Sequence, residues 1–191
     1  MSVPKLDGDT ELIIVECMVR DLEEYLKSNV LYWHVAEPNP LGSHMPQLTI
    51  GALLEAEVRA KAGGADPAAL AAARAQHDRI RAAHPALYVS QAIHELHSRL
   101  DAWQANLGDE GRKTKMSYAQ DVRVRAKIHL LENALSADTP AELHTYREQL
   151  DLELFEVFVP GEFIWDARLQ TPFPQDPCWW LYGHLLEEHF S

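Results

Sequence analysis

Hydrophobic residues recur every three or four positions along most of the chain, which is the spacing of one face of an α-helix. In residues 12–33 the apolar positions fall on one stripe, and charged residues occupy the other side. Residues 47–64 repeat the pattern and end in a glycine pair, the usual helix stop. Residues 66–84 begin with Asp66 as N-cap and Pro67 as the first helical residue. The spacing therefore predicts three helices in this half.

The second half carries further stripes of the same kind. The clearest lies in residues 85–108, and residues 117–135 and 139–157 carry two more, joined by a short connection. Two helices joined so closely are expected to form an antiparallel hairpin. A last stripe follows Pro177 and predicts a short amphipathic helix at the end of the chain. The apolar stripe of residues 85–108 consists of Val89, Ile93, Leu96, Leu100, Trp103 and Leu107.

Two Pro-rich segments, about 34–46 and 159–176, interrupt the helical pattern and are predicted to be irregular. No segment predicts a strand. A chain of 191 residues is also the size of one ordinary domain. The sequence therefore predicts an all-α fold, a single-domain helical bundle of about six or seven helices spanning residues 1–191.

Composition adds a strong acidic character to this picture. The chain has 17 basic and 29 acidic residues, a net charge of −12, while 47% of its residues are hydrophobic. Such a field repels nucleic acids and anionic membranes, so neither partner is expected. No apolar run approaches the roughly 20 residues that cross a bilayer. Two cysteines without a CxxC motif indicate reduced thiols, and we expect a cytoplasmic protein.

Ten histidines raise the question of a metal site. The Glu-x-x-His pairs of di-iron bundles and the HExxH motif of zinc proteases are both missing from the sequence. The best candidate ligands are His94, His97 and Asp101, which share one arc of a predicted helix and suit zinc, iron or nickel. That arc lies away from the apolar stripe, so a solvated polar face explains it more simply. No cofactor is predicted, and a divalent transition metal is the alternative.

Motifs for catalysis are also missing. The sequence contains no GxSxG elbow and no glycine-rich phosphate loop. Cys178 opens the predicted last helix, where the helix dipole favours a thiolate, but its apolar surroundings and Asp176 oppose that state. The missing motifs favour a protein without enzymatic activity but leave an enzyme as the alternative.

Charge is distributed unevenly along the chain. Residues 112–127 carry six bases and one acid, a net charge of 6 − 1 = +5, and residues 142–191 carry ten acids and two bases, a net charge of 2 − 10 = −8. Arg123, Arg125 and Lys127 flank one stripe of the predicted hairpin, so pairing across the hairpin is the simplest explanation. A nucleic-acid interface through residues 112–127 is the alternative, although Tyr118 is its only aromatic residue.

Aromatic residues concentrate near the end, where three of the five tryptophans lie in the last 27 residues. Aromatic side chains serve cores, ligand pockets and partner surfaces alike. We therefore expect a non-enzymatic protein that acts through contact with a protein partner or by self-association, for example as a homodimer. A metal-dependent enzyme or a bundle that binds a small ligand is the alternative. The candidate ligand or partner surface consists of Trp165, Phe173, Trp180, His184 and Glu188.

Overall fold

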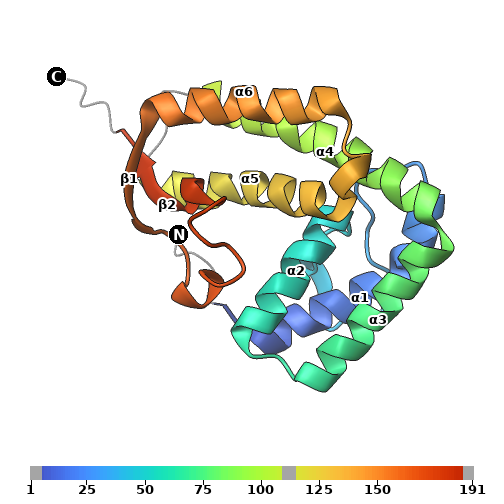
Figure 1. The fold of residues 1–191 in the computed structure, drawn as a ribbon. Helices are drawn as coiled ribbons and strands as arrows, with labels where there is room; N and C mark the ends of the chain where they lie inside the picture. Colours follow the sequence, from blue (N-terminus) through green and yellow to red (C-terminus); the bar gives the residue numbers. More distant parts are fainter. Residues whose placement is uncertain (1–5, 109–114, 187–191) are drawn as a thin grey trace.

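The computed structural model describes residues 6–108 and 115–186, and within them the chain forms a bundle of six α-helices with one two-stranded sheet (Figure 1). This confirms the predicted all-α bundle. Four short 3-10 turns lie between the larger elements: Gly42–His44 (η1), Ser136–Asp138 (η2), Ala167–Leu169 (η3) and Trp179–Leu181 (η4). The helices and strands are Gly8–Lys27 (α1), Ile50–Gly63 (α2), Pro67–Ala83 (α3), Pro85–Gly108 (α4), Lys115–Leu135 (α5), Ala141–Val157 (α6), Phe158–Phe163 (β1) and Tyr182–Leu185 (β2).

The end of α2 and the start of α3 carry the residues that the sequence predicted there. The Asp66 carboxylate accepts a hydrogen bond of 2.9 Å from the backbone N–H of Ala69, which caps α3. Gly64 follows α2 with a φ of +82°, a left-handed conformation that glycine adopts without steric cost. Pro85 separates α3 from α4, as predicted.

Helix α1 is shorter than its apolar stripe predicts. It ends at Lys27, because Ser28 turns extended and its hydroxyl donates to the Tyr25 carbonyl at 2.7 Å. Beyond this point Trp33 exchanges two backbone hydrogen bonds with Leu48, of 3.1 and 2.8 Å. The prediction that the helix continues to Trp33 is therefore wrong, since a serine cap and a pairing distant in sequence end it earlier.

The predicted helix after Pro177 is also wrong. Residues Trp179–Leu181 form one 3-10 turn, and Tyr182–Leu185 form β2, which pairs antiparallel with β1. Strand β1 begins directly after α6 and occupies the start of the segment that was predicted to be irregular. A short apolar run fits a helix or a strand equally well, so its distant pairing partner decides between them.

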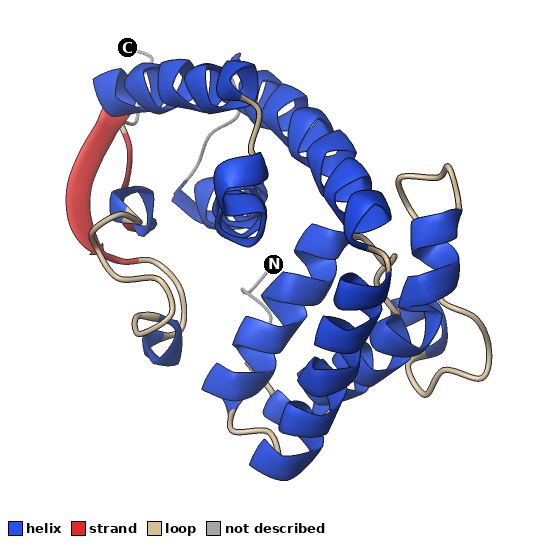
Figure 2. Cartoon of the chain, turned by 45° about the vertical axis from the view of Figure 1, so that its right-hand side comes forward, coloured by secondary structure: helices blue, strands red, loops and turns tan. Residues whose placement is uncertain are grey.

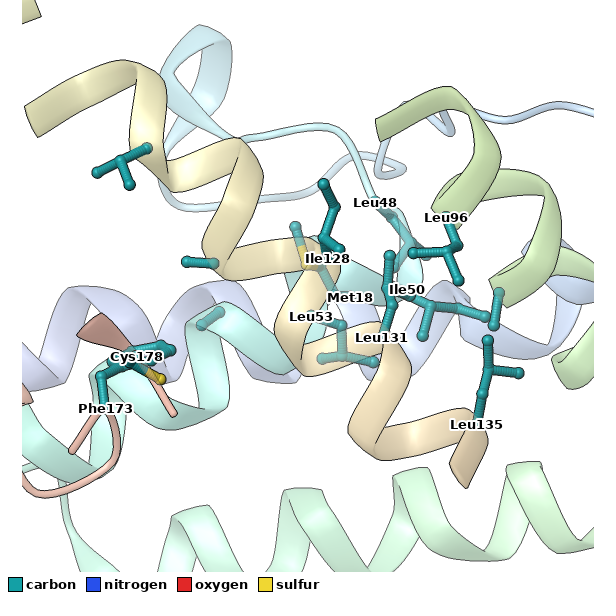
Figure 3. Packing of buried hydrophobic residues seen from close by; sticks show 14 of the residues in the cluster. Met18, Leu48, Ile50, Leu53, Leu96, Ile128, Leu131, Leu135, Phe173 and Cys178 are labelled. Atoms are coloured by element: carbon teal, nitrogen blue, oxygen red, sulfur yellow. The ribbon is translucent and has the colours of Figure 1, made fainter. Parts of the chain in front are cut away.

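The helices form two groups that share one hydrophobic cluster with residues from all six. Helix α1 packs on α2 and α3, α5 packs between α2 and α4, and α6 lies on α4 at the outside of the molecule (Figure 2). In Figure 3, side chains from α1, α2, α4 and α5 meet at the centre, with Phe173 and Cys178 from the C-terminal segment to one side. Within residues 6–108 and 115–186, every helix is too short or too polar to cross a bilayer.

Candidate interaction surface

The C-terminal half of α6 exposes two large apolar side chains to solvent. Leu152 is 68% exposed and Phe155 is 67% exposed. They are three residues apart, so they lie on the same face of the helix. Residues of this size usually bury most of their surface, and two neighbours that do not are characteristic of a contact site.

Helix α6 is positioned by its opposite face. Leu143, Leu150 and Leu154 are buried there in the common core. Leu152 and Phe155 point away from this stripe, and α6 lies at the periphery of the bundle in both ribbon views (Figures 1 and 2). The packing of the described chain therefore leaves the outer face of α6 uncovered.

The β-hairpin extends this exposed surface beyond the helix. The ring of Phe155 meets the ring of Trp179 edge to face, with centroids 5.7 Å apart. At the end of α6, Leu186 donates a backbone hydrogen bond of 2.8 Å to Val157, and their side chains are 59% and 43% exposed. We call the set Leu152, Phe155, Val157, Trp179 and Leu186 the terminal apolar patch.

Acidic side chains border the terminal apolar patch. Glu148 and Glu156 are exposed and lie one helical turn before and after Leu152. Glu153 is exposed beside them. The rim of the patch therefore carries three exposed carboxylates.

Helix α6 is fixed to α5 by charged side chains beneath the patch. The Arg125 guanidinium donates two hydrogen bonds of 2.8 Å to the Asp151 carboxylate, in a bidentate pair. It also lies 5.1 Å from the centre of the Trp180 ring. Arg147 adds a bond of 3.2 Å to Asp151 and another of 3.2 Å to Glu132. These contacts hold the outer face of α6 in one orientation.

The structure brings the three predicted aromatic candidates together, but inside the molecule. Phe173 and Trp180 are only 1% and 0% exposed. Trp165 is half-buried, donates from Nε1 to the Ala119 carbonyl at 2.8 Å, and meets Phe173 edge to face at 5.6 Å. Phe173 and Trp180 therefore form none of the exposed surface, and Trp165 forms only part of it. His184 lies on β2 opposite Val159, and Glu188 lies outside the described residues.

Two reactive side chains in this region are held in their neutral forms. Burial raises the pKa of the Cys178 thiol to about 11, so it is not a thiolate nucleophile at neutral pH. The pKa of His129 is lowered to about 4, mainly because the side chain is largely buried and also because the positive charges of Arg125 and Arg147 are nearby. His129 packs against the rings of Phe173 and Trp180, with centroids 6.4 and 6.3 Å away. Both groups therefore act as packing residues here.

The predicted metal ligands lie on an exposed face of α4. His97 Nδ1 is 3.2 Å from an Asp101 carboxylate oxygen, with side chains 61% and 57% exposed. His94 is exposed nearby, and Asp101 also accepts a long hydrogen bond of 3.4 Å from the Tyr146 hydroxyl. Among the described residues, no group of three or more histidines, cysteines and acids is arranged to hold a metal ion.

Three basic residues of α5, namely Arg123, Arg125 and Lys127, are paired with acids in the described part of the chain. Arg123 and Lys127 contact Glu55 of α2 at 2.7 and 3.3 Å, and Arg125 contacts Asp151 of α6. Pairing across the α5–α6 hairpin is thus correct for Arg125, whereas α2 supplies the partner of the other two. Residues 112–114 of the basic stretch lie outside the described residues.

Leu152 and Phe155 were not among the residues predicted from the sequence, although the sequence carries a signal for them. Both residues lie off the apolar stripe of 139–157, so a helix that uses that stripe for the core must expose them.

Comparison with known proteins adds no information about the function of this chain. The chain matches no protein-family model, no curated protein and no solved structure, so any function must be argued from its own surface.

Proposed function

We propose that this protein is a non-enzymatic cytoplasmic helical bundle that binds another protein through the terminal apolar patch. The observation that carries the proposal is the exposure of Leu152 and Phe155, at 68% and 67%, on the same face of a helix whose other face is buried in the core. Exposed apolar anchors on a rigid element are typical of protein docking sites.

The occupant is best described as a basic amphipathic helix of a different protein. Such a helix can place apolar residues over Leu152, Phe155 and Trp179 and direct lysines or arginines toward the acidic rim. A second copy of this chain is less suitable, because it would bring Glu148 and Glu156 against the same acids. Self-association therefore becomes an alternative outcome of the test.

The proposed location rests on the cysteines. Cys17 and Cys178 are both free and buried in the core. Free thiols suit a reducing compartment, which supports the cytoplasm. Binding of the proposed kind requires no cofactor, since burial of apolar area and charge complementarity supply the affinity.

Capture from a lysate of the source organism tests the proposal. We expect a partner bound by the wild-type chain to be lost when Leu152→Ser and Phe155→Ser are combined, because the two anchors lose their apolar area. We also expect recovery to fall at high salt, since the rim contacts are electrostatic. The measurement is quantitative mass spectrometry of the captured proteins, with sedimentation analysis of the purified chain.

The matched control combines Val30→Ser with Leu87→Ser. These two side chains are also exposed, at 45% and 39%, but they lie away from α6. A partner retained by the control and lost by the α6 variant supports the proposal. Equal recovery with both variants, a monomer that captures nothing, or a dimer broken by the α6 variant would each contradict it.

A further inference from the structure

A second feature lies at the lower left of Figure 1, where the segment around η3 approaches the C-terminal half of α2. A cavity of about 460 Å³ opens there between α2, α3 and residues 168–172. Three cationic side chains line it, namely Lys61, Arg74 and Arg168. In a chain with a net charge of −12, three cations around one hollow are a local reversal of charge.

Two of these cations are held in place by other groups. Arg168 donates to the Asp166 carboxylate at 2.8 and 3.0 Å and to the Leu6 carbonyl at 3.0 Å. Arg74 is 52% exposed and contacts the Glu57 carboxylate through Nε at 3.3 Å. Lys61 is exposed and pairs with no acidic side chain among the described residues. The cavity thus has two oriented guanidinium groups and one free ammonium group.

Glu57 is the one acid on the cavity wall, and its carboxylate is already satisfied. It accepts a hydrogen bond of 2.7 Å from His77 Nδ1, and His77 Nε2 lies 3.2 Å from the Tyr88 hydroxyl. Glu57 and His77 are only 5% and 4% exposed. The three cations and the two acids, Glu57 and Asp166, give the surroundings of the cavity a net charge of 3 − 2 = +1. The remaining positive charge faces the cavity.

We propose that this cavity binds a small organic phosphate ester. Arginine forks and a lysine ammonium are the groups that recognise phosphate oxygens, and the Thr171 hydroxyl on the same wall can donate another hydrogen bond. The volume exceeds what a phosphate group alone occupies, and Val58 and Pro172 give an apolar wall for the organic part. This site lies on elements other than α6, so it does not depend on the proposed partner surface.

Phenyl phosphate is a suitable probe, because it combines one phosphate ester with a small apolar body. At constant ionic strength, we expect it to cause saturable amide chemical-shift changes around Lys61, Arg74 and Thr171 in nuclear magnetic resonance spectra. Benzoate and inorganic phosphate should bind more weakly, since each lacks half of the recognised chemistry. Lys61→Gln should weaken phenyl phosphate binding on the order of tenfold, because one charged hydrogen bond is lost.

Arg79→Gln is the matched control. Arg79 is an exposed arginine on α3, the helix that carries Arg74, and it bonds to the Ala75 carbonyl outside the cavity. Its replacement should leave phenyl phosphate binding unchanged, whereas Arg168→Gln should weaken it as Lys61→Gln does. Shifts that fail to saturate, shifts elsewhere on the molecule, or equal affinities of Lys61→Gln and Arg79→Gln would overturn the proposal.

Discussion

Arg125 shows how a charged side chain can fix the position of a surface helix. Its side chain is 5% exposed and reaches from α5 to Asp151 of α6, with one face over the Trp180 ring. A buried ion pair adds little net stability when complete, but breaking it leaves an uncompensated charge in the core. The pair therefore fixes the orientation of α6 more than it stabilises the fold.

Asp151→Asn tests this role. The substitution keeps the size of the side chain and removes its charge, so Arg125 remains buried without its main partner. We expect the free energy of unfolding to fall by about 3 kcal/mol, measured by urea denaturation. Glu148→Gln on the same helix is the control, since Glu148 is 55% exposed and its loss should cost less than about 0.5 kcal/mol. Similar effects of the two variants would show that the buried pair has no special role.

His129 should make stability depend on pH. Its pKa in the folded protein is about 4, against 6.5 for an unperturbed histidine, because burial and two nearby arginines oppose its charge. The unfolded chain therefore binds more protons between these values, and the free energy of unfolding must decrease as pH falls from about 6.5 to 4. We expect this residue alone to account for about 2–3 kcal/mol of the decrease.

His129→Gln should make the stability curve flatter in this window, measured by urea denaturation at several pH values. His97→Gln is the control, because His97 is 61% exposed on α4. The free energy of unfolding of the His129→Gln variant could instead fall with decreasing pH as steeply as that of the wild-type chain. That result would mean that His129 is protonated as easily in the folded chain as in the unfolded one.

The β1–β2 hairpin depends on a close approach at Gly183. A Cβ atom at this position would collide with the Val159 carbonyl oxygen and with the Phe158 ring. Gly183→Ala should therefore separate the strands and lower the free energy of unfolding by at least about 2 kcal/mol, followed by tryptophan fluorescence during urea denaturation.

Gly161→Ala is the control within the same hairpin. A Cβ atom at Gly161 would meet the Gly183 Cα at 3.5 Å, an ordinary contact. This change should cost less than about 1 kcal/mol. Equal losses from the two alanines would contradict the close packing that we describe at Gly183.

The helices were predictable from sequence because each carries its own apolar repeat, and the end of α2 and the start of α3 also carry end signals. Asp66 and Gly64 act through hydrogen bonds or backbone conformation within one turn, so local sequence is sufficient for them. The β-hairpin was not predictable, because Pro160 pairs with Gly183 and no local pattern reports such a partner. Ser28 ends α1 through a hydrogen bond from its hydroxyl to the Tyr25 carbonyl, but the apolar stripe continues past Ser28 and so predicted a longer helix.

The candidate sites were less predictable than the fold, since exposure and ion pairing depend on how the helices meet. Trp180 and Leu152 are both apolar residues near the chain end, yet the first is 0% and the second 68% exposed. Glu55 pairs with two basic residues of α5, a contact between elements far apart in sequence. Only the position of Leu152 and Phe155 off the apolar stripe gave an advance indication of their exposure.

At the scale of the whole molecule, the described chain combines a helical bundle, in a protein of net charge −12, with an exposed apolar face on α6. The buried leucines of helix α6 and its Asp151 attach it to the rest of the bundle, while the side chains of Leu152 and Phe155 are mostly exposed to solvent. We expect its acidic rim to disfavour anionic surfaces and a second copy of the chain. We propose that this face binds a basic amphipathic helix of another protein.

The most direct test is the dissociation constant of the captured partner, measured by calorimetry against the wild-type chain and against the combined Leu152→Ser and Phe155→Ser variant. Two lost anchors should weaken binding by at least about 100-fold, and the remaining affinity should fall further with added salt. Affinities of the two chains within about threefold of each other would contradict the claim, because the partner would then bind elsewhere.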